Sequence, residues 1–366
     1  MGSNRRSWAA VAMATTVALA ALQPSAAAAG SSVRTQVAAD AAWIQQGQLS
    51  DGAIAWYVDR QHISPYLGNY AAIGLAEAHK VTGAAADLTA ATAWLRWYAA
   101  HENASGFVTD YDVSAAGVET STGDMDSTDA YAGTFLLATR AVFRAGASKA
   151  TIRSLSAGIV GAVAAIEATQ DADGLTWAKP TWHVKYLMDA TETYAGLRAA
   201  ADLAIVLGNP ALNARATKDA DALSAGIAGL WNPTVSAYDW ARHDGGAQTV
   251  TNWANLYSDS MEQAWAATFG LADPARASAL LSTVTAAHPQ WGQPQATDVS
   301  NGTPAPVGYW PVVGWGLLRA GQTGQALTAA ASIRTAALGT SRTWPFTTGN
   351  AGQLIVLESG DVSLVS

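Results

Sequence analysis

The chain has 366 residues, of which half are hydrophobic, and it contains 15 Trp, 11 Tyr and no Cys. The lack of Cys excludes a disulfide framework and thiol chemistry, so a large hydrophobic core has to stabilise the fold. The formal net charge is -8 and no cluster of Lys or Arg occurs, which argues against nucleic acid or an anionic membrane surface as a partner.

Residues 1–29 predict a secretory signal peptide. Arg5 and Arg6 precede the apolar stretch WAAVAMATTVALAAL, and the small residues of PSAAAAG follow it. This order is typical of a cleaved export signal, and the apolar stretch is short for a membrane span. Cleavage would leave 18 basic against 28 acidic residues, a net charge of -10. We therefore expect a secreted, extracellular monomer with no membrane span and one domain over residues 30–366.

The rest of the chain predicts helices almost throughout, because Ala, Leu and Val recur at spacings of three and four. Helix ends are expected at Gly83, Gly146, Gly208, Gly270 and Gly321, which are 63, 62, 62 and 51 residues apart. This period indicates a repeat of an outer helix, an aromatic turn and an inner helix. The predicted outer helices include 84–101, 148–169, 210–231 and 274–288, and the predicted inner helices are 65–82, 127–145, 185–207, 255–270, 306–320 and 349–358.

Six consecutive helical hairpins can close into a ring with one helix of each hairpin outside and the other inside. The repeat resembles the six-hairpin (α/α)6 toroid of glycoside hydrolases and some polysaccharide lyases. We therefore predict an all-α fold, an (α/α)6 toroid of six helical hairpins. An open α-solenoid is the alternative, and the lack of a polar capping repeat favours the closed ring.

In a toroid the inner helices run in one direction, so their N-terminal ends share one mouth with the aromatic turns. Aromatic rings at such a mouth can stack on the apolar faces of sugars, which predicts a carbohydrate substrate. The alternative is that these rings only pack the tops of the helices. The predicted substrate-binding aromatic residues are Trp56, Tyr57, Tyr66, Trp177, Trp182, Trp240, Tyr257, Trp291, Tyr309, Trp310 and Trp344.

Three successive inner helices carry two acidic residues three positions apart, which places both on one helix face. The same pattern is typical of a helix cap, because an N-terminal acidic side chain accepts hydrogen bonds from free backbone N–H groups. For the first pair we expect Asp126 to be the cap and Asp129 to face substrate. The pairs are Asp126 and Asp129 in DSTD, Asp189 and Glu192 in DATE, and Asp259 and Glu262 in DSME.

The stretch STDAYAGTF around Asp129 is similar to the T-D-x-D-type aspartate at the start of an inner helix in family 8 glycoside hydrolases. This resemblance implies a sugar-site role for Asp129. The acid of that family is a Glu at the start of the first inner helix, whereas HISPYLGNYAAIGLA has Tyr66 and Asn69 there. The resemblance therefore transfers to Asp129 alone.

These observations predict a secreted glycoside hydrolase that acts on a neutral or cationic polysaccharide or oligosaccharide. Asp129 and Asp189 are the predicted acid and base, with Asp259 and Asp59 as further catalytic candidates. The toroid resemblance implies inversion, which needs a carboxyl separation of roughly 6.5–9.5 Å.

The other predicted substrate contacts are Asn69, Asp126, His183, Lys185, Glu192 and Glu262. A polysaccharide lyase using Tyr with His or Lys, and a non-catalytic glycan-binding toroid, are the alternative functions. We predict no cofactor and no metal, because DMDSTD lacks the spacing of an EF-hand.

Overall fold

The computed structural model describes residues 26–295, 299–300, 303–304 and 307–365. Residues 1–25, the greater part of the predicted signal peptide, lie outside the described residues. No helix of the described part is long and apolar enough to span a bilayer.

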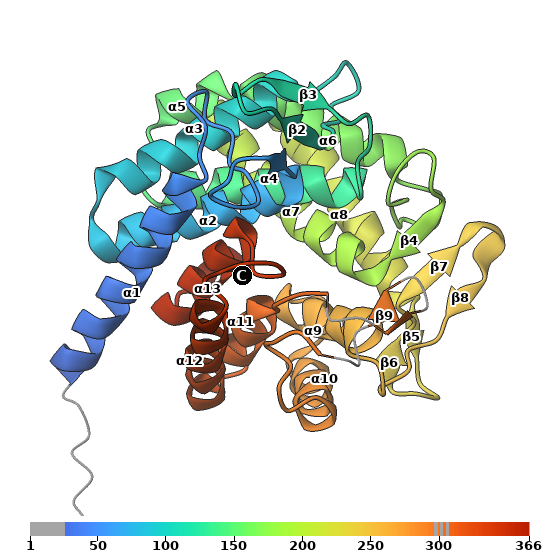
Figure 1. Cartoon of the computed structure of the whole chain (residues 1–366). Coiled ribbons are helices and arrows are strands. Elements are labelled where there is room, and N and C mark those ends of the chain that lie inside the picture. The colour runs from blue at the N-terminus through green and yellow to red at the C-terminus, as the bar shows by residue number, and fades with distance from the viewer. Residues whose placement is uncertain (1–25, 296–298, 301–302, 305–306, 366) are drawn as a thin grey trace, which may run out of the picture.

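Helices in two concentric layers build the fold (Figure 1). The outer layer consists of α1 (Ala26–Gln46), α3 (Ala85–His101), α5 (Lys149–Ser154) with α6 (Ser156–Thr169), α8 (Pro210–Ala228), α10 (Pro274–Ala287) and α12 (Thr323–Gly339). The inner layer consists of α2 (Pro65–Thr82), α4 (Thr128–Arg144), α7 (Leu187–Leu207), α9 (Met261–Thr268), α11 (Pro311–Arg319) and α13 (Thr348–Ser359). Each inner helix follows an outer one, which gives the six predicted hairpins.

The inner helices form a closed ring. Each packs against the next in the order α2, α4, α7, α9, α11 and α13, and α13 packs back against α2. In Figure 1 the red α13 accordingly lies beside the blue α2. The prediction of an all-α (α/α)6 toroid is confirmed, and the open solenoid is excluded because the last inner helix meets the first.

Glycines end the helices where the sequence predicts. Gly83 and Gly208 follow α2 and α7 with φ angles of 76° and 69°, the left-handed conformation that a residue without Cβ adopts at little cost. The other three predicted glycines also have positive φ: Gly146, Gly270 and Gly321.

Glycines also allow the inner helices to approach closely. A Cβ atom added to Gly74 of α2 would lie 2.2 Å from Cα of Gly352 on α13. A Cβ atom added to Gly196 of α7 would lie 2.4 Å from Cα of Gly133 on α4. The Gly and Ala content of the inner helices therefore reflects backbone contact between neighbours, and larger side chains fill the space between the two layers.

Small antiparallel sheets, which the sequence pattern did not predict, occupy the turns. The three-stranded sheets have the orders β1-β2-β3 and β4-β7-β8, and β5 pairs with β6 and β9 with β10. The strands are β1 (His62–Ile63), β2 (Tyr111–Val113), β3 (Glu119–Ser121), β4 (Val184–Tyr186), β5 (Trp231–Asn232), β6 (Ala237–Tyr238), β7 (Ala241–His243), β8 (Gln248–Thr249), β9 (Val299–Ser300) and β10 (Thr303–Pro304).

Three predicted inner helices begin later than expected, and one of them is α11, which starts at Pro311 and not at residue 306. The prediction for residues 185–186 is wrong, because Lys185 pairs with Arg242 in a sheet and α7 starts at Leu187. Before α9, residues 256–260 form one wide turn, η2 (Leu256–Ser260), in which Tyr257 has extended backbone angles. All three changes lie at the mouth of the ring.

A buried ion-pair cluster joins the first outer helix to the last hairpin. Arg334 of α12 donates from Nε to Glu358 Oε1 of α13 over 2.7 Å, and its Nη2 contacts Asp40 of α1. Arg342 contacts the same Asp40 carboxylate. The cluster therefore fixes the place where the ring closes.

Candidate active site

Two connected cavities lie at the mouth of the ring. Their volumes are about 630 Å³ and about 430 Å³, and they share the lining residues Asp126, Met188 and Tyr257. Residues at or just before the N-terminal ends of all six inner helices line them, as the shared-mouth argument predicts. One from each is Tyr66 (α2), Asp126 (α4), Asp189 (α7), Glu262 (α9), Trp310 (α11) and Asn350 (α13).

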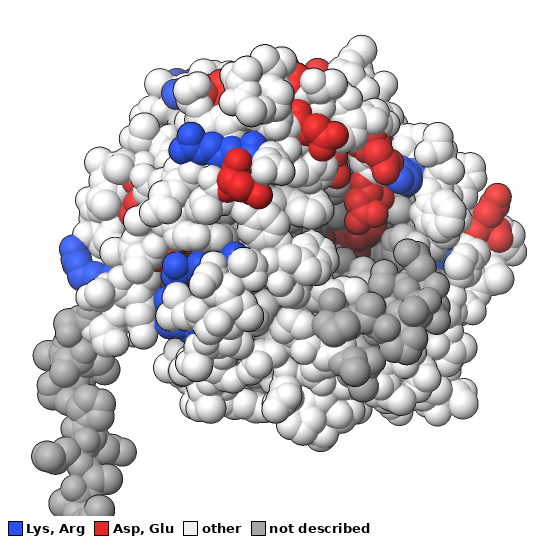
Figure 2. All heavy atoms as spheres, in the orientation of Figure 1, with Lys and Arg blue, Asp and Glu red and all other residues white. Residues whose placement is uncertain are grey.

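The cavity walls are acidic. None of the described lining residues is Lys, Arg or His. Figure 2 shows Asp and Glu side chains gathered in a hollow of the molecule. Such a surface favours neutral or positively charged ligands and repels anionic ones. The lining carboxylates are Asp110, Asp124, Asp126, Asp189, Asp259 and Glu262.

Three pairs of nearly parallel aromatic rings line the cavities, and each pair joins two segments distant in the sequence. Their flat apolar faces are suited to stacking with sugar rings. The pairs and their centroid distances are Trp56 with Trp344 (6.2 Å), Tyr186 with Trp240 (6.0 Å) and Tyr257 with Trp310 (5.0 Å). All but Tyr186 belong to the predicted set, as do Tyr66 and Tyr309, which also line the smaller cavity.

Asp129 and Asp189 are brought together by a serine between them. Ser127 Oγ lies 2.8 Å from Asp129 Oδ1 and 2.7 Å from Asp189 Oδ2. The sum of those two distances is the largest possible separation of these two carboxylate oxygens. That separation is shorter than the roughly 6.5–9.5 Å between the carboxyl groups of an inverting pair. The two aspartates therefore form one hydrogen-bonded unit and do not flank a bond with a water between them.

Asp129 lies behind Ser127 and outside the cavity walls. It is fully buried, and its carboxylate accepts hydrogen bonds from the Ala130 N–H group (2.8 Å), the Thr176 hydroxyl and Ser127. Burial raises the pKa of Asp129 to about 6, and those hydrogen bonds limit the rise. Asp129 therefore does not face the cavity, contrary to the prediction.

Asp189 does line the larger cavity, from the first turn of α7. Burial raises the pKa of Asp189 well above the ordinary carboxyl range, and the nearby charge of Asp129 raises it further. This environment favours a carboxyl group that keeps its proton.

Asp126 lies where the two cavities join. The predicted cap at this residue is wrong, because Ser127 occupies the N-cap position of α4. The Asp126 side chain is accessible to solvent, but the cavity walls surround it closely enough to raise its pKa, chiefly by desolvation. Asp126 therefore presents a carboxylate to both cavities.

Glu192 lies beneath the smaller cavity. Its Oε1 atom accepts hydrogen bonds from Tyr66 Oη (2.8 Å), Trp265 Nε1 (2.8 Å) and the Tyr70 hydroxyl. Burial raises the pKa of Glu192 to about 7, against the lowering effect of these donors. Because Tyr66 and Trp265 line the cavity, Glu192 orients two wall residues and does not itself form part of the wall.

The third predicted acidic pair lines the larger cavity. Asp259 accepts hydrogen bonds from the Asn252 N–H group (2.7 Å) and Asn255 Nδ2 (3.1 Å). Glu262 accepts one from the Met188 N–H group (3.1 Å), and burial raises its pKa well above the usual range. Both carboxyl groups thus hold the turns around the cavity as well as facing it.

Several predicted residues lie away from the cavities. Asp59 is exposed on a turn, and Lys185 is buried between Asp171 (2.6 Å) and Asp173 (2.8 Å). The Lys185 ammonium group also lies 4.0 Å from the ring centroid of Trp177. This lysine is therefore neutralised by neighbours and stabilises the turn.

Other predicted contacts pack or bond elsewhere. His183 Nε2 contacts the Pro180 carbonyl (3.1 Å), and Trp182 is 52% exposed with its Nε1 bonded to Tyr186 Oη (3.1 Å). Asn69 is fully buried and donates to the Tyr131 carbonyl (3.0 Å). Tyr57 and Trp291 pack against or within the core.

Ser127, Asp110 and Tyr131 belong to the site, although they were not predicted from the sequence as site residues. Tyr131 Oη donates to Asp110 Oδ1 (2.9 Å) and accepts from the Asp126 N–H group (3.2 Å). Burial raises the pKa of Asp110 to about 6. The density of acidic residues in the 110–129 segment was the available signal, but the sheet β1-β2-β3 that positions Asp110 was not predicted.

Within the described part of the chain, no group of three or more His, Asp or Glu side chains is arranged to hold a metal ion.

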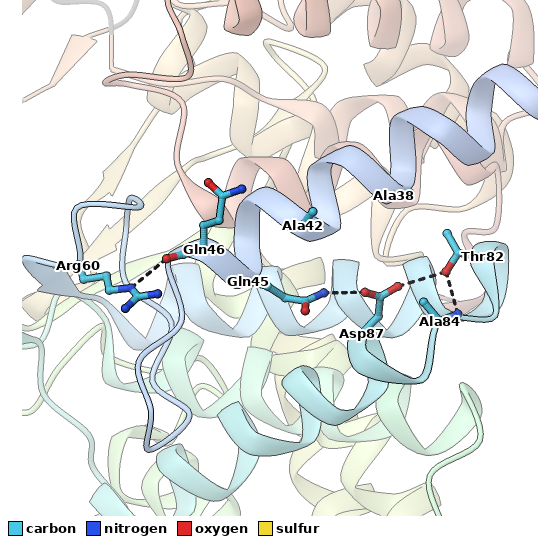
Figure 3. A pocket seen from close by; sticks show the side chains of 8 residues that line it. All are labelled: Ala38, Ala42, Gln45, Gln46, Arg60, Thr82, Ala84 and Asp87. Atoms are coloured by element: carbon cyan, nitrogen blue, oxygen red, sulfur yellow. Dashed lines mark hydrogen bonds between the residues drawn. The ribbon is translucent and has the colours of Figure 1, made fainter.

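Another cavity, of about 450 Å³, lies outside the ring between α1 and the α2–α3 turn (Figure 3). There Gln45 Nε2 and Thr82 Oγ1 both donate to Asp87, and Arg60 Nε donates to the Gln46 carbonyl. Because these polar groups satisfy one another, we place the candidate site at the mouth of the ring.

Comparison with known proteins shows the same fold. No protein-family model and no curated protein matches the sequence. A solved structure described as a wild-type glycosidase is 16% identical with a TM-score of 0.65, over 92% of this chain and 98% of its own. A GH63 mannosylglycerate hydrolase from Thermus thermophilus, in complex with glucose, is 12% identical with a TM-score of 0.60, over 89% of this chain and 99% of its own. A D-mannose isomerase is 12% identical with a TM-score of 0.56, over 92% of this chain and 96% of its own.

The chain therefore has the (α/α)6 toroid fold found in these glycosidases and in a sugar isomerase. The finer likeness to family 8 glycoside hydrolases stays a prediction.

Proposed function

We propose that the protein is a glycoside hydrolase that cleaves a glycosidic bond inside the joined cavities. The observation that carries this proposal is that two carboxyl groups in unlike environments, Asp189 and Asp126, line one aromatic-walled cavity. The fold shared with glycosidases supports it. Secretion after removal of residues 1–29, and action as a monomer, belong to the same proposal.

Asp189 is the general acid in this mechanism. A general acid has to hold a proton at the working pH, and burial together with the charge of Asp129 raises the pKa of Asp189 accordingly. The Asp189 proton passes to the glycosidic oxygen as the bond to the anomeric carbon breaks. Asp189 then carries the negative charge.

Asp126 is the general base. Its side chain is the accessible carboxylate at the junction of the cavities, where a water molecule can reach it. The water oxygen bonds to the anomeric carbon, and its proton passes to Asp126. This assignment replaces the predicted pair of Asp129 and Asp189, because Asp129 does not line the cavity.

The acidic walls favour neutral or amino sugars over uronates. Elimination from a uronate needs a cation or metal to neutralise the carboxylate, and the described lining residues include no Lys, Arg or His. This observation favours hydrolysis over the lyase alternative. A sugar isomerase is a second candidate, because a D-mannose isomerase shares the fold.

Product analysis separates these functions. The purified protein would be incubated with neutral and amino-sugar glycans in water enriched in ¹⁸O. Hydrolysis yields two sugars, one labelled at its new reducing end, whereas isomerisation leaves the mass unchanged and elimination gives an unsaturated product. Binding without any product would favour the glycan-binding alternative and contradict the proposal.

Substitution tests the catalytic roles. We expect Asp189→Asn and Asp126→Asn each to lower kcat by about a hundredfold or more, because each removes one proton-transfer group. Asp221→Asn, on the exposed side of α8, is the control and should retain full turnover. Near-normal turnover by either catalytic variant would exclude that residue from the role proposed for it.

A further inference from the structure

We propose that Asp129 keeps a proton on Asp189 and that Ser127 joins the two carboxyl groups in a hydrogen-bonded relay. Asp129 is then a positioning residue that acts through Ser127 and does not meet substrate. The inference rests on the proposed function for the role of Asp189 as the acid, but the relay itself is a property of the resting protein.

The first step is a count of protons. Ser127 Oγ carries one hydrogen and lies 2.8 Å from Asp129 Oδ1 and 2.7 Å from Asp189 Oδ2. One hydroxyl can donate to only one of these oxygens at a time. If both carboxylates were ionised, the other oxygen would face a serine lone pair inside the protein. One of the two aspartates therefore carries a proton.

The second step assigns that proton. Asp129 accepts from the Ala130 N–H group and from the Thr176 hydroxyl, independently of Ser127. Donors of this kind stabilise the ionised form of a carboxyl group. For Asp189 the structure gives a side-chain hydrogen bond with Ser127. The proton therefore belongs on Asp189, which donates to Ser127 Oγ, while the Ser127 hydrogen points to Asp129.

The surroundings act in the same direction. The titratable groups that face Asp189 or share its cavity are acidic, so no described cation among them favours its ionisation. The pKa of Asp189 is raised first by burial and then by the charge of Asp129. These groups are Asp126 just before α4, Asp129 in its first turn, Glu192 on α7, Asp259 in η2, Glu262 on α9, and the phenols Tyr66, Tyr186 and Tyr257.

The relay also has a consequence during turnover. When Asp189 gives its proton to the glycosidic oxygen, Asp189 becomes a carboxylate beside Ser127. Rotation of the Ser127 hydroxyl then supplies that carboxylate with a donor, while Ala130 and Thr176 still serve Asp129. No proton crosses the relay, and the proton gained by Asp126 returns to Asp189 through solvent.

The direct test is a titration that needs no substrate. Protein labelled with ¹³C at the aspartate carboxyl carbons would be titrated by NMR, and the signal lost in Asp189→Asn identifies Asp189. We expect this signal to titrate well above the usual aspartate range. In Asp129→Asn its midpoint should move to lower pH, because the neighbouring negative charge is gone.

Substitutions of Ser127 test the bridge. Ser127→Ala removes the hydroxyl that can donate to the ionised Asp189 carboxylate, a hydrogen bond that lowers the pKa of Asp189, so the Asp189 midpoint should move to higher pH. Ser127→Thr keeps a hydroxyl and should leave the midpoint near the wild-type value. Thermal unfolding would verify that each variant is folded. The relay is rejected if the high-pH signal persists in Asp189→Asn, or if Asp129→Asn leaves the midpoint unchanged.

The two proposals fail separately. A high-titrating Asp189 in a protein that hydrolyses no glycan would retain the relay and reject the glycosidase. If hydrolysis is found, Asp129→Asn should shift the basic limb of the pH–kcat profile to lower pH, with activity recovering as the pH falls. A merely structural role would lower kcat by the same factor at every pH.

Discussion

Glu192 carries its three hydrogen bonds on one oxygen. Oε1 accepts from Tyr66, Tyr70 and Trp265, while the buried Oε2 atom has no hydrogen-bond partner among the described residues. An ionised carboxylate in this place would leave charge on an unpaired buried oxygen, which is unfavourable. Burial accordingly raises the pKa of Glu192 to about 7.

This shift predicts how pH affects stability. The pKa of Glu192 is about 7 in the folded protein, against an ordinary Glu value of 4.5, so between these values the folded protein binds more protons than the unfolded chain. The contribution of Glu192 to the free energy of unfolding therefore falls as pH rises through this window. Glu192→Gln is isosteric with the neutral form and does not titrate.

We expect Glu192→Gln and the wild type to be equally stable at the acidic end of that window. Toward its upper end the variant should become more stable, by on the order of 3 kcal/mol. Urea unfolding of both proteins at several pH values measures the difference. A difference that stays constant with pH would contradict the assignment.

Asp126 and Asp129 also show why the site was only partly predictable from the sequence. Asp126 and Asp129 both fit a capping pattern, and one position decides which of them faces the cavity. Because Ser127 is the N-cap, Asp126 precedes the helix and reaches the mouth, whereas Asp129 turns into the packed interior. The sequence pattern alone does not contain that one-residue choice.

At the scale of elements, glycine serves two separate purposes. Glycines after the helices allow left-handed turns, and that repeat made the hairpin period visible in the sequence. Glycines within the inner helices sit where backbones touch, as between Gly196 and Gly133. The second use depends on which helices are neighbours, so the sequence reveals it only once the ring is known.

A single added methyl group should test the close contact. Gly196→Ala places a Cβ 2.4 Å from Cα of Gly133, which α4 and α7 can relieve only by moving apart. We expect a loss of about 1–3 kcal/mol in the free energy of unfolding. Gly324→Ala on α12 is the matched control, because nothing lies within 4 Å of its added Cβ.

In the control, alanine should stabilise the helix by roughly 0.5–1 kcal/mol. Chemical unfolding of both variants measures the two effects. Equal effects at the two sites would contradict the contact between α4 and α7.

The turns were the least predictable elements. Short strands such as β4 and β7 have three residues each and no periodicity that a sequence could display. Because the turns differ in structure, equivalent tryptophans in the repeat have different roles: Trp56, Trp240 and Trp344 line the cavities, whereas Trp177 lies under Lys185 and Trp291 is buried.

At the scale of the molecule, the closure of the ring depends on charge as well as on packing. Arg334 pairs with Glu358 and Asp40, so α12, α13 and α1 are joined through one guanidinium group. All three side chains are buried. Removing this cation would leave the buried Glu358 carboxylate without its ion-pair partner and Asp40 with Arg342 alone.

We expect Arg334→Met to lower the free energy of unfolding by about 3–5 kcal/mol, the usual effect of breaking a buried ion pair. Arg96→Met, on the exposed face of α3, is the control and should change it little. Thermal or urea unfolding of both variants measures the change in the free energy of unfolding. An unchanged Arg334→Met variant would show that the ring closes without the Arg334 guanidinium group.

The contact between α2 and α13 also determines when the ring can close during synthesis. During synthesis α2 is the first inner helix to be made, and the helix that covers its Gly74 surface is the last. Until residues 348–359 leave the ribosome, this face of α2 has no native neighbour and the mouth lacks one of its six walls. A nascent chain of this protein therefore completes the ring only after α13 has been made, and until then α2 is exposed to chaperones or to association with other chains.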